Sequence, residues 1–481
     1  MEWRFQRRAA IALASLAFGI CAAGAGTAQQ EPRGANAETP LATGVVLPDV
    51  TEKADPTQSF ALYLPSRYSA EKRWPVIYAF DWAAHGELPV RLLAPAAEKR
   101  GYIVLGSNAS HNGSARDALA AALALWQDSR ARFWIDPKQS YTTGFSGASR
   151  NAFVFADRCG CIQGVIAVGA GLPPLAHKLE SLSYVVFMTL GTYDFNYPEL
   201  VSLEEELDSL HVPNRLWRFD GDHQWPPGEV MAEAVDWLHL EAMQQGRRAV
   251  DAAFVSDMRS RTLQRAQAGE KAGDWILAYE EYRKGAEEFK GLADTGEFSS
   301  RASALASSPD LRKAEKEEHE DLTKQQRMVG GVEEALTSLP SGSFELGRRM
   351  SDISAQADQV RDFAKRAKKP RDVRVARRAV NDIFATAFEA GLGQLRDQKA
   401  EPAEMYFQVA AEVAPESPAP PFELAKVYMK LGDKKRALRS LEAAVAKGMK
   451  KVSLLTDTAE FEPLRADERF QSLVKKLGGQ P

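Results

Sequence analysis

Short apolar runs alternate with longer amphipathic segments along the first half of the chain. The runs predict β-strands at residues 59–64, 74–80, 102–106, 141–143, 164–169, 184–190 and 216–219, and the segments between them have helical periodicity, most clearly at 115–133. Because parallel neighbouring strands need a crossover connection, this alternation predicts an α/β fold with a mainly parallel sheet. Ligands of such sheets bind beyond the carboxyl ends of the strands, so polar residues at those ends are the candidates for chemistry.

The second half of the chain has a different pattern. From residue 246 onward β-favouring runs are rare and Ala, Glu, Lys and Arg dominate, which predicts an all-α region. A period of 34 residues relates Ala403, Phe407 and Ala410 to Ala437, Leu441 and Ala444. This period, with small residues where helices cross, resembles that of tetratricopeptide repeats. Each such unit has an apolar face that it buries only by stacking on its neighbours.

Two segments of the second half are less regular. Residues 300–370 are highly charged and poorly periodic, and three alternatives stay open for them: long helices, degenerate repeats or a partly disordered linker. The tail at 454–477 resembles the closing helix that caps repeat arrays.

The N-terminus has the plan of a signal peptide. Arg4, Arg7 and Arg8 precede an apolar run at 9–23, and small residues follow up to Ala28. This plan predicts an exported protein, periplasmic or extracellular. Because the run is short for a membrane span, we expect no span in the mature chain. The expected organisation is a signal peptide (1–28), a linker (29–44), an α/β domain (45–245), a charged helical region (246–370) and tetratricopeptide-like repeats (371–481).

Composition supports this division and narrows the functional classes. Seven of the nine Trp and six of the seven His lie within 51–250, so the chemistry is expected there. The net charge of −4 argues against broad nucleic-acid binding. After cleavage only Cys159 and Cys161 remain, and the single residue between them argues against a disulfide, so both are expected to be small buried residues. They lack metal-ligand spacing.

Three polar residues follow predicted strands in an informative order. Ser146 stands in the sequence Gly-Phe-Ser-Gly-Ala between a strand and a helical segment, which is the layout of a nucleophile elbow. Asp194 follows the strand at 184–190, and His223 follows the strand at 216–219. A serine hydroxyl is a weak nucleophile until an imidazole takes its proton, and a carboxylate orients that imidazole. The sequence therefore predicts a catalytic triad of Ser146, Asp194 and His223.

These motifs carry a family resemblance. Residues 45–245 resemble an α/β-hydrolase of the secreted esterase kind, similar to polyhydroxybutyrate-depolymerase-like and feruloyl-esterase-like proteins, through PVIYAFD (75–81), GFSGAS (144–149), GTYDFN (191–196) and FDGDHQWP (219–226). The resemblance implies that Ser146 is the nucleophile, Asp194 the acid and His223 the base. It also places an oxyanion hole at the backbone N–H groups of Gly147 and of the loop at Trp82. This chain departs from many relatives, which have His-Gly where it has Asp-Trp.

Candidates for substrate binding are weaker. Asp81, His111, Asn112, Phe195 and Trp225 lie at or near strand ends beside the predicted triad, although polar loops and core aromatics are equally consistent with these positions.

The remaining histidines and acids nearby are expected to be structural. His211 precedes the last strand, and His239 lies within an amphipathic segment at 229–243. Asp220 and Asp222 are too close to His223 along the chain to orient its ring, so they are expected to shape its turn.

The sequence therefore predicts an exported serine hydrolase, a carboxylic-ester hydrolase by preference and a peptidase as the alternative on the same triad. No metal or organic cofactor is expected. The expected partners are a small-molecule or polymeric ester and a protein that docks on the helical repeats, with no nucleic acid. A second hypothesis is a catalytically inactive hydrolase-fold module that serves a repeat-based scaffold, but a decayed enzyme is expected to have lost one of the three triad residues.

Overall fold

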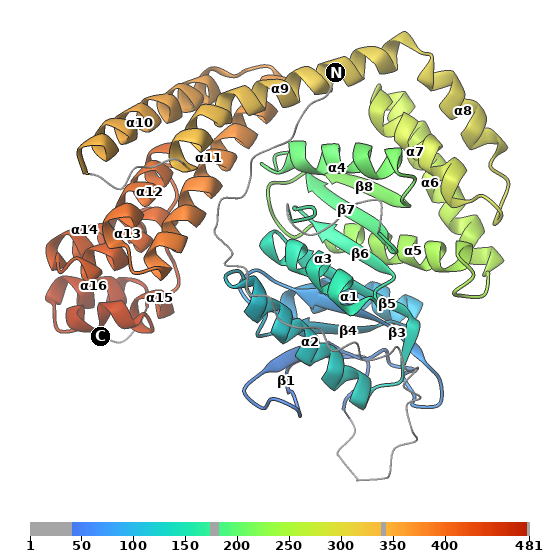
Figure 1. Cartoon of the computed structure of the whole chain (residues 1–481), viewed down its shortest axis with the longest axis horizontal. Coiled ribbons are helices and arrows are strands. Elements are labelled where there is room, and N and C mark those ends of the chain that lie inside the picture. Colours follow the sequence, from blue (N-terminus) through green and yellow to red (C-terminus); the bar gives the residue numbers. More distant parts are fainter. Residues whose placement is uncertain (1–40, 174–181, 338–342, 479–481) are drawn as a thin grey trace, which may run out of the picture.

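The computed structural model describes residues 41–173, 182–337 and 343–478 and consists of a sheet domain followed by an array of helices (Figure 1). The predicted signal peptide and residues 29–40 of the predicted linker lie outside the described residues. Among the described residues, no helix combines the length and the apolar character needed to cross a membrane.

The sheet has eight strands. They are β1 (Val46–Thr51), β2 (Ser59–Tyr63), β3 (Trp74–Phe80), β4 (Ile103–Ser107), β5 (Ile135–Phe145), β6 (Gly164–Val168), β7 (Val185–Gly191) and β8 (Asn214–Phe219). Their order is β1-β2-β4-β3-β5-β6-β7-β8. β2 is antiparallel to both of its neighbours and all other pairs are parallel. This is the α/β-hydrolase fold, so the predicted fold class is confirmed.

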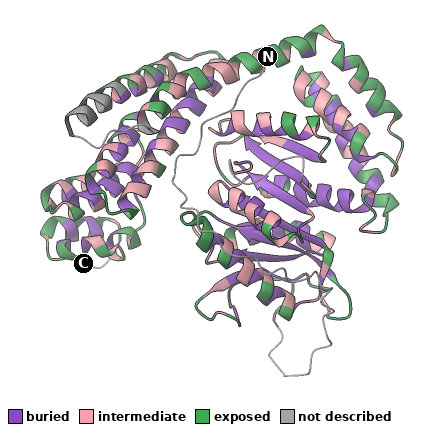
Figure 2. Cartoon of the chain, viewed as in Figure 1, coloured by how far each residue is buried: buried purple, intermediate pink, exposed green. Residues whose placement is uncertain are grey.

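Helices cover both faces of the sheet. α2 (Ala115–Arg132), α3 (Gly147–Cys159) and α4 (Tyr197–Ser209) pack on one face, and α1 (Glu87–Arg100) and α5 (Gly228–Gln244) pack on the other. Alternate residues of β3 enter the two cores, Tyr78 on the α3 side and Ile77 on the α1 side. The central strands are buried on both faces (Figure 2), which explains why they are continuous apolar runs in the sequence.

Two features of the sheet domain differ from the sequence prediction. β1 was not predicted, because only Val50 of its six residues is buried and the strand has no apolar run. Cys159 and Cys161, predicted to be free, form a disulfide. The reason is that α3 ends at Gly160, whose left-handed backbone (φ 60°) turns the chain back and brings the two Cα atoms to 5.1 Å, within the range that a disulfide spans.

The array that follows is helical throughout its described residues. Its members are α6 (Ala252–Ala272), α7 (Trp275–Glu288), α8 (Gly296–Ala306), α9 (Pro309–Thr337), α10 (Ser343–Arg366), α11 (Pro370–Arg396), α12 (Ala400–Val413), α13 (Ala419–Lys430), α14 (Lys434–Ala446), α15 (Ser453–Thr456), the 3₁₀-helix η2 (Ala459–Leu464) and α16 (Glu468–Lys476). Of the alternatives for 300–370, the structure has long helices. The tail is three short helices instead of the single closing helix: the first ends at Thr456, and the side chain of Asp467 caps the start of the last.

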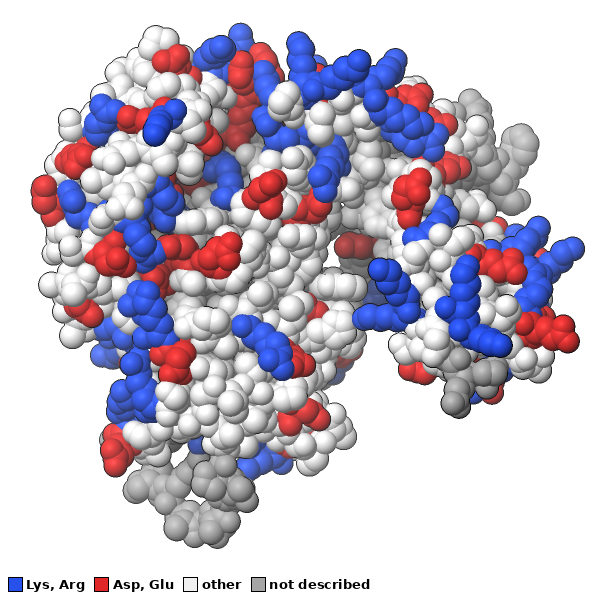
Figure 3. All heavy atoms as spheres, turned by 180° about the vertical axis from the view of Figure 1, so that it is seen from behind, with Lys and Arg blue, Asp and Glu red and all other residues white. Residues whose placement is uncertain are grey.

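The 34-residue period corresponds to structure. Ala403, Phe407 and Ala410 lie on α12, their counterparts lie on α14, and all six are completely buried. The helices pack closely where small residues recur: a Cβ built on Gly391 would lie 2.7 Å from the Phe407 ring. The surface is hollowed between these C-terminal helices and the sheet domain (Figure 3).

The first helices of the array share a core with the sheet domain. Phe254 of α6 and Tyr282 of α7 pack with Met243 of α5. Beside this core, the guanidinium of Arg215 on β8 forms ion pairs with Glu281 (2.9 Å) and Glu288 (2.7 Å) of α7. All three side chains are at most 6% exposed, so the charges compensate each other in a site that excludes water.

We expect Arg215→Met to destabilise the protein by about 3–5 kcal/mol, because it leaves the buried Glu288 carboxylate without its cation and the buried Glu281 carboxylate with Arg265 alone. The matched control is Arg469→Met, which removes an equally bidentate but exposed pair with Glu442 and should cost at most about 1 kcal/mol. Urea unfolding of both variants measures the difference. Equal losses would contradict the assigned importance of the buried pair.

A second buried charge lies where β1 ends. Glu52 is 1% exposed, and neither carboxylate oxygen has a hydrogen-bond partner among the described residues. Burial, assisted by repulsion from Asp128 and Asp55, raises the pKa of Glu52 to about 7. The folded state therefore holds a proton that the unfolded state releases above about pH 4.5.

The stability of the protein should consequently fall as pH rises from about 4.5 to about 7, because the folded state binds more protons than the unfolded state in that window. Glu52→Gln should remove this loss and stabilise the protein by roughly 1–3 kcal/mol at pH 8, with no gain at pH 4. Urea unfolding at the two pH values tests this, with the exposed Glu71→Gln as control. A gain of the same size at both pH values would refute the assignment.

Candidate active site

Ser146 occupies a strained turn between β5 and α3. Its backbone has φ 58° and ψ −126°, a conformation that a residue other than glycine rarely adopts. The turn is tight, since a Cβ built on Gly144 would lie 2.2 Å from the carbonyl oxygen of Ala148. Ala148 itself is completely buried, so alanine fits where the usual motif has its second glycine. The sequence therefore folds locally as the predicted elbow.

The structure brings Ser146, His223 and Asp194 into one hydrogen-bonded chain. Nε2 of His223 lies 2.8 Å from Oγ of Ser146, and Nδ1 lies 2.9 and 3.0 Å from the two carboxylate oxygens of Asp194. The Asp194 side chain is 1% exposed and that of His223 is 15% exposed. The three residues come from loops after β5, β8 and β7, which end at the same edge of the sheet.

Asp194 is held by groups that the sequence analysis missed. The backbone N–H of Asn196 donates to its Oδ1 (2.8 Å), and the Asn196 amide donates to the carbonyl of Gly169 (2.7 Å). Gly169 has φ 66°, and a Cβ there would lie 3.1 Å from both Asp194 and the His223 ring. Position 169 must therefore be glycine, because a side chain there would crowd both the Asp194 carboxylate and the His223 ring. The only signal in the sequence was the position of Asn196, two residues beyond Asp194.

Aromatic rings surround the imidazole. The rings of Phe195 and Phe145 lie 4.3 and 4.7 Å from the His223 ring, centroid to centroid. Phe195, predicted to contact substrate, is thus placed at the site but packs on the base. Trp225 is half-buried beside Phe145 (5.8 Å), and its indole N–H donates to Asp81 (2.9 Å).

Asp81 does not face a substrate. Its side chain is 1% exposed, and its oxygens accept hydrogen bonds from the indole of Trp225 and from the backbone of Ala83 (2.9 Å). The prediction that Asp81 contacts substrate is therefore corrected: it connects the loop after β3 to the loop that carries His223. The position of Asp81 could have indicated this role, since an acid directly after a buried strand can accept hydrogen bonds from the backbone of its own turn.

The predicted oxyanion groups lie close to Asn112. Gly147 opens α3, and a Cβ on it would lie 2.3 Å from Oδ1 of Asn112. The Asn112 backbone N–H donates to the carbonyl of Trp82 (2.8 Å), which joins the loops after β3 and β4. The backbone N–H groups of Gly147 and Trp82 donate to no acceptor among the described residues. Both are thus available to a ligand.

The other histidines lie apart from this chain of hydrogen bonds. His111 is exposed on the rim, with Nδ1 2.9 Å from the carbonyl of Ala109. His239 is buried, and burial together with Arg248 and Arg100 lowers its pKa to about 3, so it stays neutral. His211 is exposed in the turn after α4. The expectation that His211 and His239 are structural agrees with these positions.

Helices of the array reach the loops that carry the acid and the base. The Arg378 guanidinium on α11 donates to the carbonyl of Thr192 (2.7 Å) and lies 3.3 Å from the Tyr197 ring centroid. Asn381 donates to the Tyr193 carbonyl (3.3 Å).

Two further contacts extend this interface. Arg377 of α11 pairs with Asp222, next to His223, and Gln325 of α9 donates to the Phe195 carbonyl (3.1 Å). In Figure 1, α11 runs along the side of the array that faces the sheet domain. The sequence contained no sign of these contacts.

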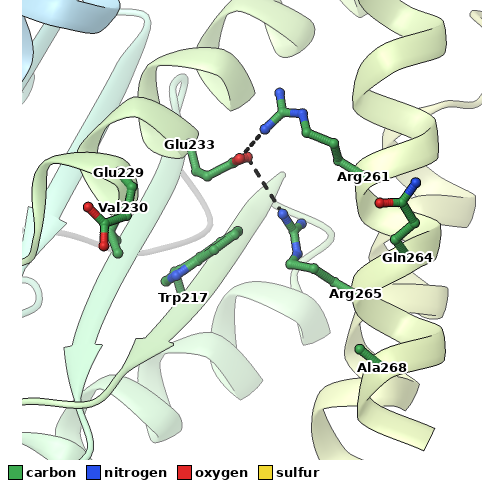
Figure 4. A pocket seen from close by; sticks show the side chains of 8 residues that line it. All are labelled: Trp217, Glu229, Val230, Glu233, Arg261, Gln264, Arg265 and Ala268. Atoms are coloured by element: carbon green, nitrogen blue, oxygen red, sulfur yellow. Dashed lines mark hydrogen bonds and ion pairs between the residues drawn. The ribbon is translucent and has the colours of Figure 1, made fainter. Parts of the chain in front are cut away.

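An open hollow of about 380 Å³ lies elsewhere, between β8, α5 and α6 (Figure 4). Its arginines, Arg261 and Arg265, both form ion pairs with Glu233, and Arg265 also lies over the Trp217 ring. The charges of its two arginines are therefore already compensated, and its lining includes no member of the Ser146 site. Within the described ranges, no group of three or more His, Cys, Asp or Glu side chains is arranged to hold a metal ion.

No known protein family matches this sequence, and no curated protein matches it either. Solved structures are similar to the sheet domain. An S-formylglutathione hydrolase from Staphylococcus aureus is 14% identical over 41% of this chain and 98% of its own, with a TM-score of 0.34. An esterase from Pyrobaculum calidifontis is 14% identical over 42% and 87% (TM-score 0.35), and one from Thermogutta terrifontis is 18% identical over 40% and 89% (TM-score 0.33).

We expect Gly144→Ala to disrupt the elbow, because the added methyl would meet the Ala148 carbonyl at 2.2 Å, and the backbone there cannot yield without moving Ser146. The substitution should lower stability by about 1–3 kcal/mol. The control is Gly330→Ala in α9, where nothing lies within 4 Å and alanine should be neutral or slightly stabilising. Thermal unfolding of both variants measures this, and equal melting temperatures would count against the tight turn.

Proposed function

We propose that this protein is a serine hydrolase that cleaves carboxylic esters through an acyl-enzyme on Ser146. The observation that supports this most is the hydrogen-bonded chain Ser146–His223–Asp194, with its serine on a strained elbow. A decayed, inactive module would not need to keep this geometry at three separate loops. The inactive scaffold is thus the weaker alternative.

The geometry supports the following sequence of steps. The Nδ1–H group of His223 donates a hydrogen bond to the Asp194 carboxylate, which fixes the tautomer with an unprotonated Nε2 that can accept the proton of the Ser146 hydroxyl. Oγ then bonds to the ester carbonyl carbon, and His223 returns the proton to the departing alcohol as the C–O bond breaks. Water, deprotonated by His223, then attacks the acyl carbon, and His223 returns that proton to Oγ of Ser146 as the acyl–Oγ bond breaks and the acid product leaves.

Charge on the carbonyl oxygen needs donors that are free of other partners. The N–H groups of Gly147 and Trp82 meet this requirement, and we assign them as the oxyanion hole. Asn112 would line the same space through its carboxamide, since that group lies against Gly147. His111, Phe195 and Trp225 would border the substrate, while Asp81 holds the Trp82 loop.

The proposal extends to the rest of the chain. Export by the N-terminal signal would place the hydrolase in the periplasm or outside the cell. The C-terminal helix pairs, with their buried 34-residue period, would be tetratricopeptide-type repeats that offer a surface to a protein partner. The same triad could cleave amides, because His223 can protonate an amine leaving group as it protonates an alcohol. We propose esters because the motifs around the triad resemble those of esterases.

The decisive experiment is covalent labelling of the purified protein with a fluorophosphonate. We expect wild type to be labelled and Ser146→Ala to be unlabelled, because only a serine activated by an imidazole reacts. His223→Ala should slow labelling at least about a hundredfold, the scale of general-base assistance. His211→Asn is the control, since that histidine is exposed and precedes β8, at the opposite end of the strand from His223. A folded wild type that resists labelling would reject the hydrolase function.

A further inference from the structure

Helix α11 presents one face to the sheet domain: one end of that face is hydrogen-bonded to it, and the other end lies next to it. At about 100° per residue, Arg378, Glu389 and Arg396 fall within about 20° of one line along the helix. Arg378 is bound to the loop that carries Asp194, as described above. At the other end, Nη1 of Arg396 would lie 2.9 Å from a Cβ built on Gly113, next to Asn112. The face therefore extends from the acid loop to the Asn112 loop, on either side of Ser146.

Glu389 lies on this line between Arg378 and Arg396. With a rise of about 1.5 Å per residue, it lies ~16 Å along the axis from Arg378 and ~10 Å from Arg396. Arg150, one helical turn after Ser146, and His223, when its ring is protonated, would lower the pKa of the Glu389 carboxyl through their positive charge. A residue of the C-terminal array is thus placed in the electrostatic environment of the candidate triad.

Neither of these groups is free to pair with Glu389. Both ring nitrogens of His223 are engaged, with Ser146 and with Asp194. The Arg150 guanidinium is bound by both oxygens of Glu199, at 2.8 and 2.7 Å. Glu389 itself has no ion pair or hydrogen bond in the part of the chain that the structure describes.

The environment of Glu389 favours the arrival of a cation. Its side chain reaches solvent, so a ligand can approach it. The surrounding protein nevertheless withdraws it from bulk water, and this desolvation raises its pKa. A carboxylate in such a place gains more from a positive partner than one on an open surface does.

We propose that Glu389 is a recognition site for a positively charged, ammonium-type group of the substrate, whose ester carbonyl is then presented to Ser146. This specificity rests on the proposed hydrolase function. The helical array thereby contributes a side chain to the substrate-binding site of the sheet domain. An anionic substrate would be repelled by the same carboxylate.

The test compares two ligands of the same shape in the Ser146→Ala background, where neither is consumed. Butyrylcholine carries a quaternary ammonium, and 3,3-dimethylbutyl butyrate has a carbon atom in place of the nitrogen. Isothermal titration calorimetry at low ionic strength should show the cationic ester binding about tenfold more tightly than the neutral one. Glu389→Gln should abolish that preference and leave the affinity for the neutral ester unchanged. Glu401→Gln, an exposed carboxylate on α12, should keep the preference.

Three outcomes would overturn the recognition site: equal affinities of the two esters when Glu389 is intact, a preference that survives Glu389→Gln, or no measurable binding of the cationic ester. Because binding is measured without turnover, the outcome is independent of the labelling experiment. A preference for the cationic ester without labelling of wild-type Ser146 would support the Glu389 recognition site and reject the hydrolase function. Labelling without that preference would support the hydrolase function and reject the recognition site.

Discussion

The hydrogen bonds of a single imidazole constrain the whole sheet domain. His223 must place one ring nitrogen 2.8 Å from Ser146 and the other about 3 Å from Asp194, although the three residues follow three different strands. That is possible only because β5, β6, β7 and β8 run parallel and end together. It also requires the strained backbone of Ser146 and the glycine at 169, which clears the space between acid and base. Strain of this kind persists only where the surrounding structure enforces it.

The helical array is coupled to this geometry. Arg378 and Asn381 of α11 hold the backbone of the Asp194 loop, and Arg377 pairs with the neighbour of His223. At the far edge of the sheet, the buried ion pairs of Arg215 fasten β8 to α7. The array is therefore attached to the strands and loops that position the site. A change in its packing would shift the backbone of the loops that carry Asp194 and His223.

Local sequence patterns predicted the parts of the fold in which local chemistry and tertiary burial agree. β3 and β7 are buried at every position because both faces of the central sheet are covered, so they are nearly continuous apolar runs and were recognisable as strands. The elbow was recognisable because its turn excludes large residues at fixed positions around Ser146. β1 was missed because a single buried residue makes no pattern. The disulfide was missed because it depends on the left-handed backbone of Gly160.

The sequence by itself thus determined the α/β class, the helical character of the second half, and the three residues that the structure joins around His223. Only the tertiary structure decided what surrounds them. Asp81 became a loop anchor because Trp225, far along the chain, donates to it. Arg378 came to hold the loop of Asp194 because α11 docks on loops nearly two hundred residues earlier. The physical reason is that the sequence pattern of an amphipathic helix is the same whether its polar face contacts water or another part of the protein.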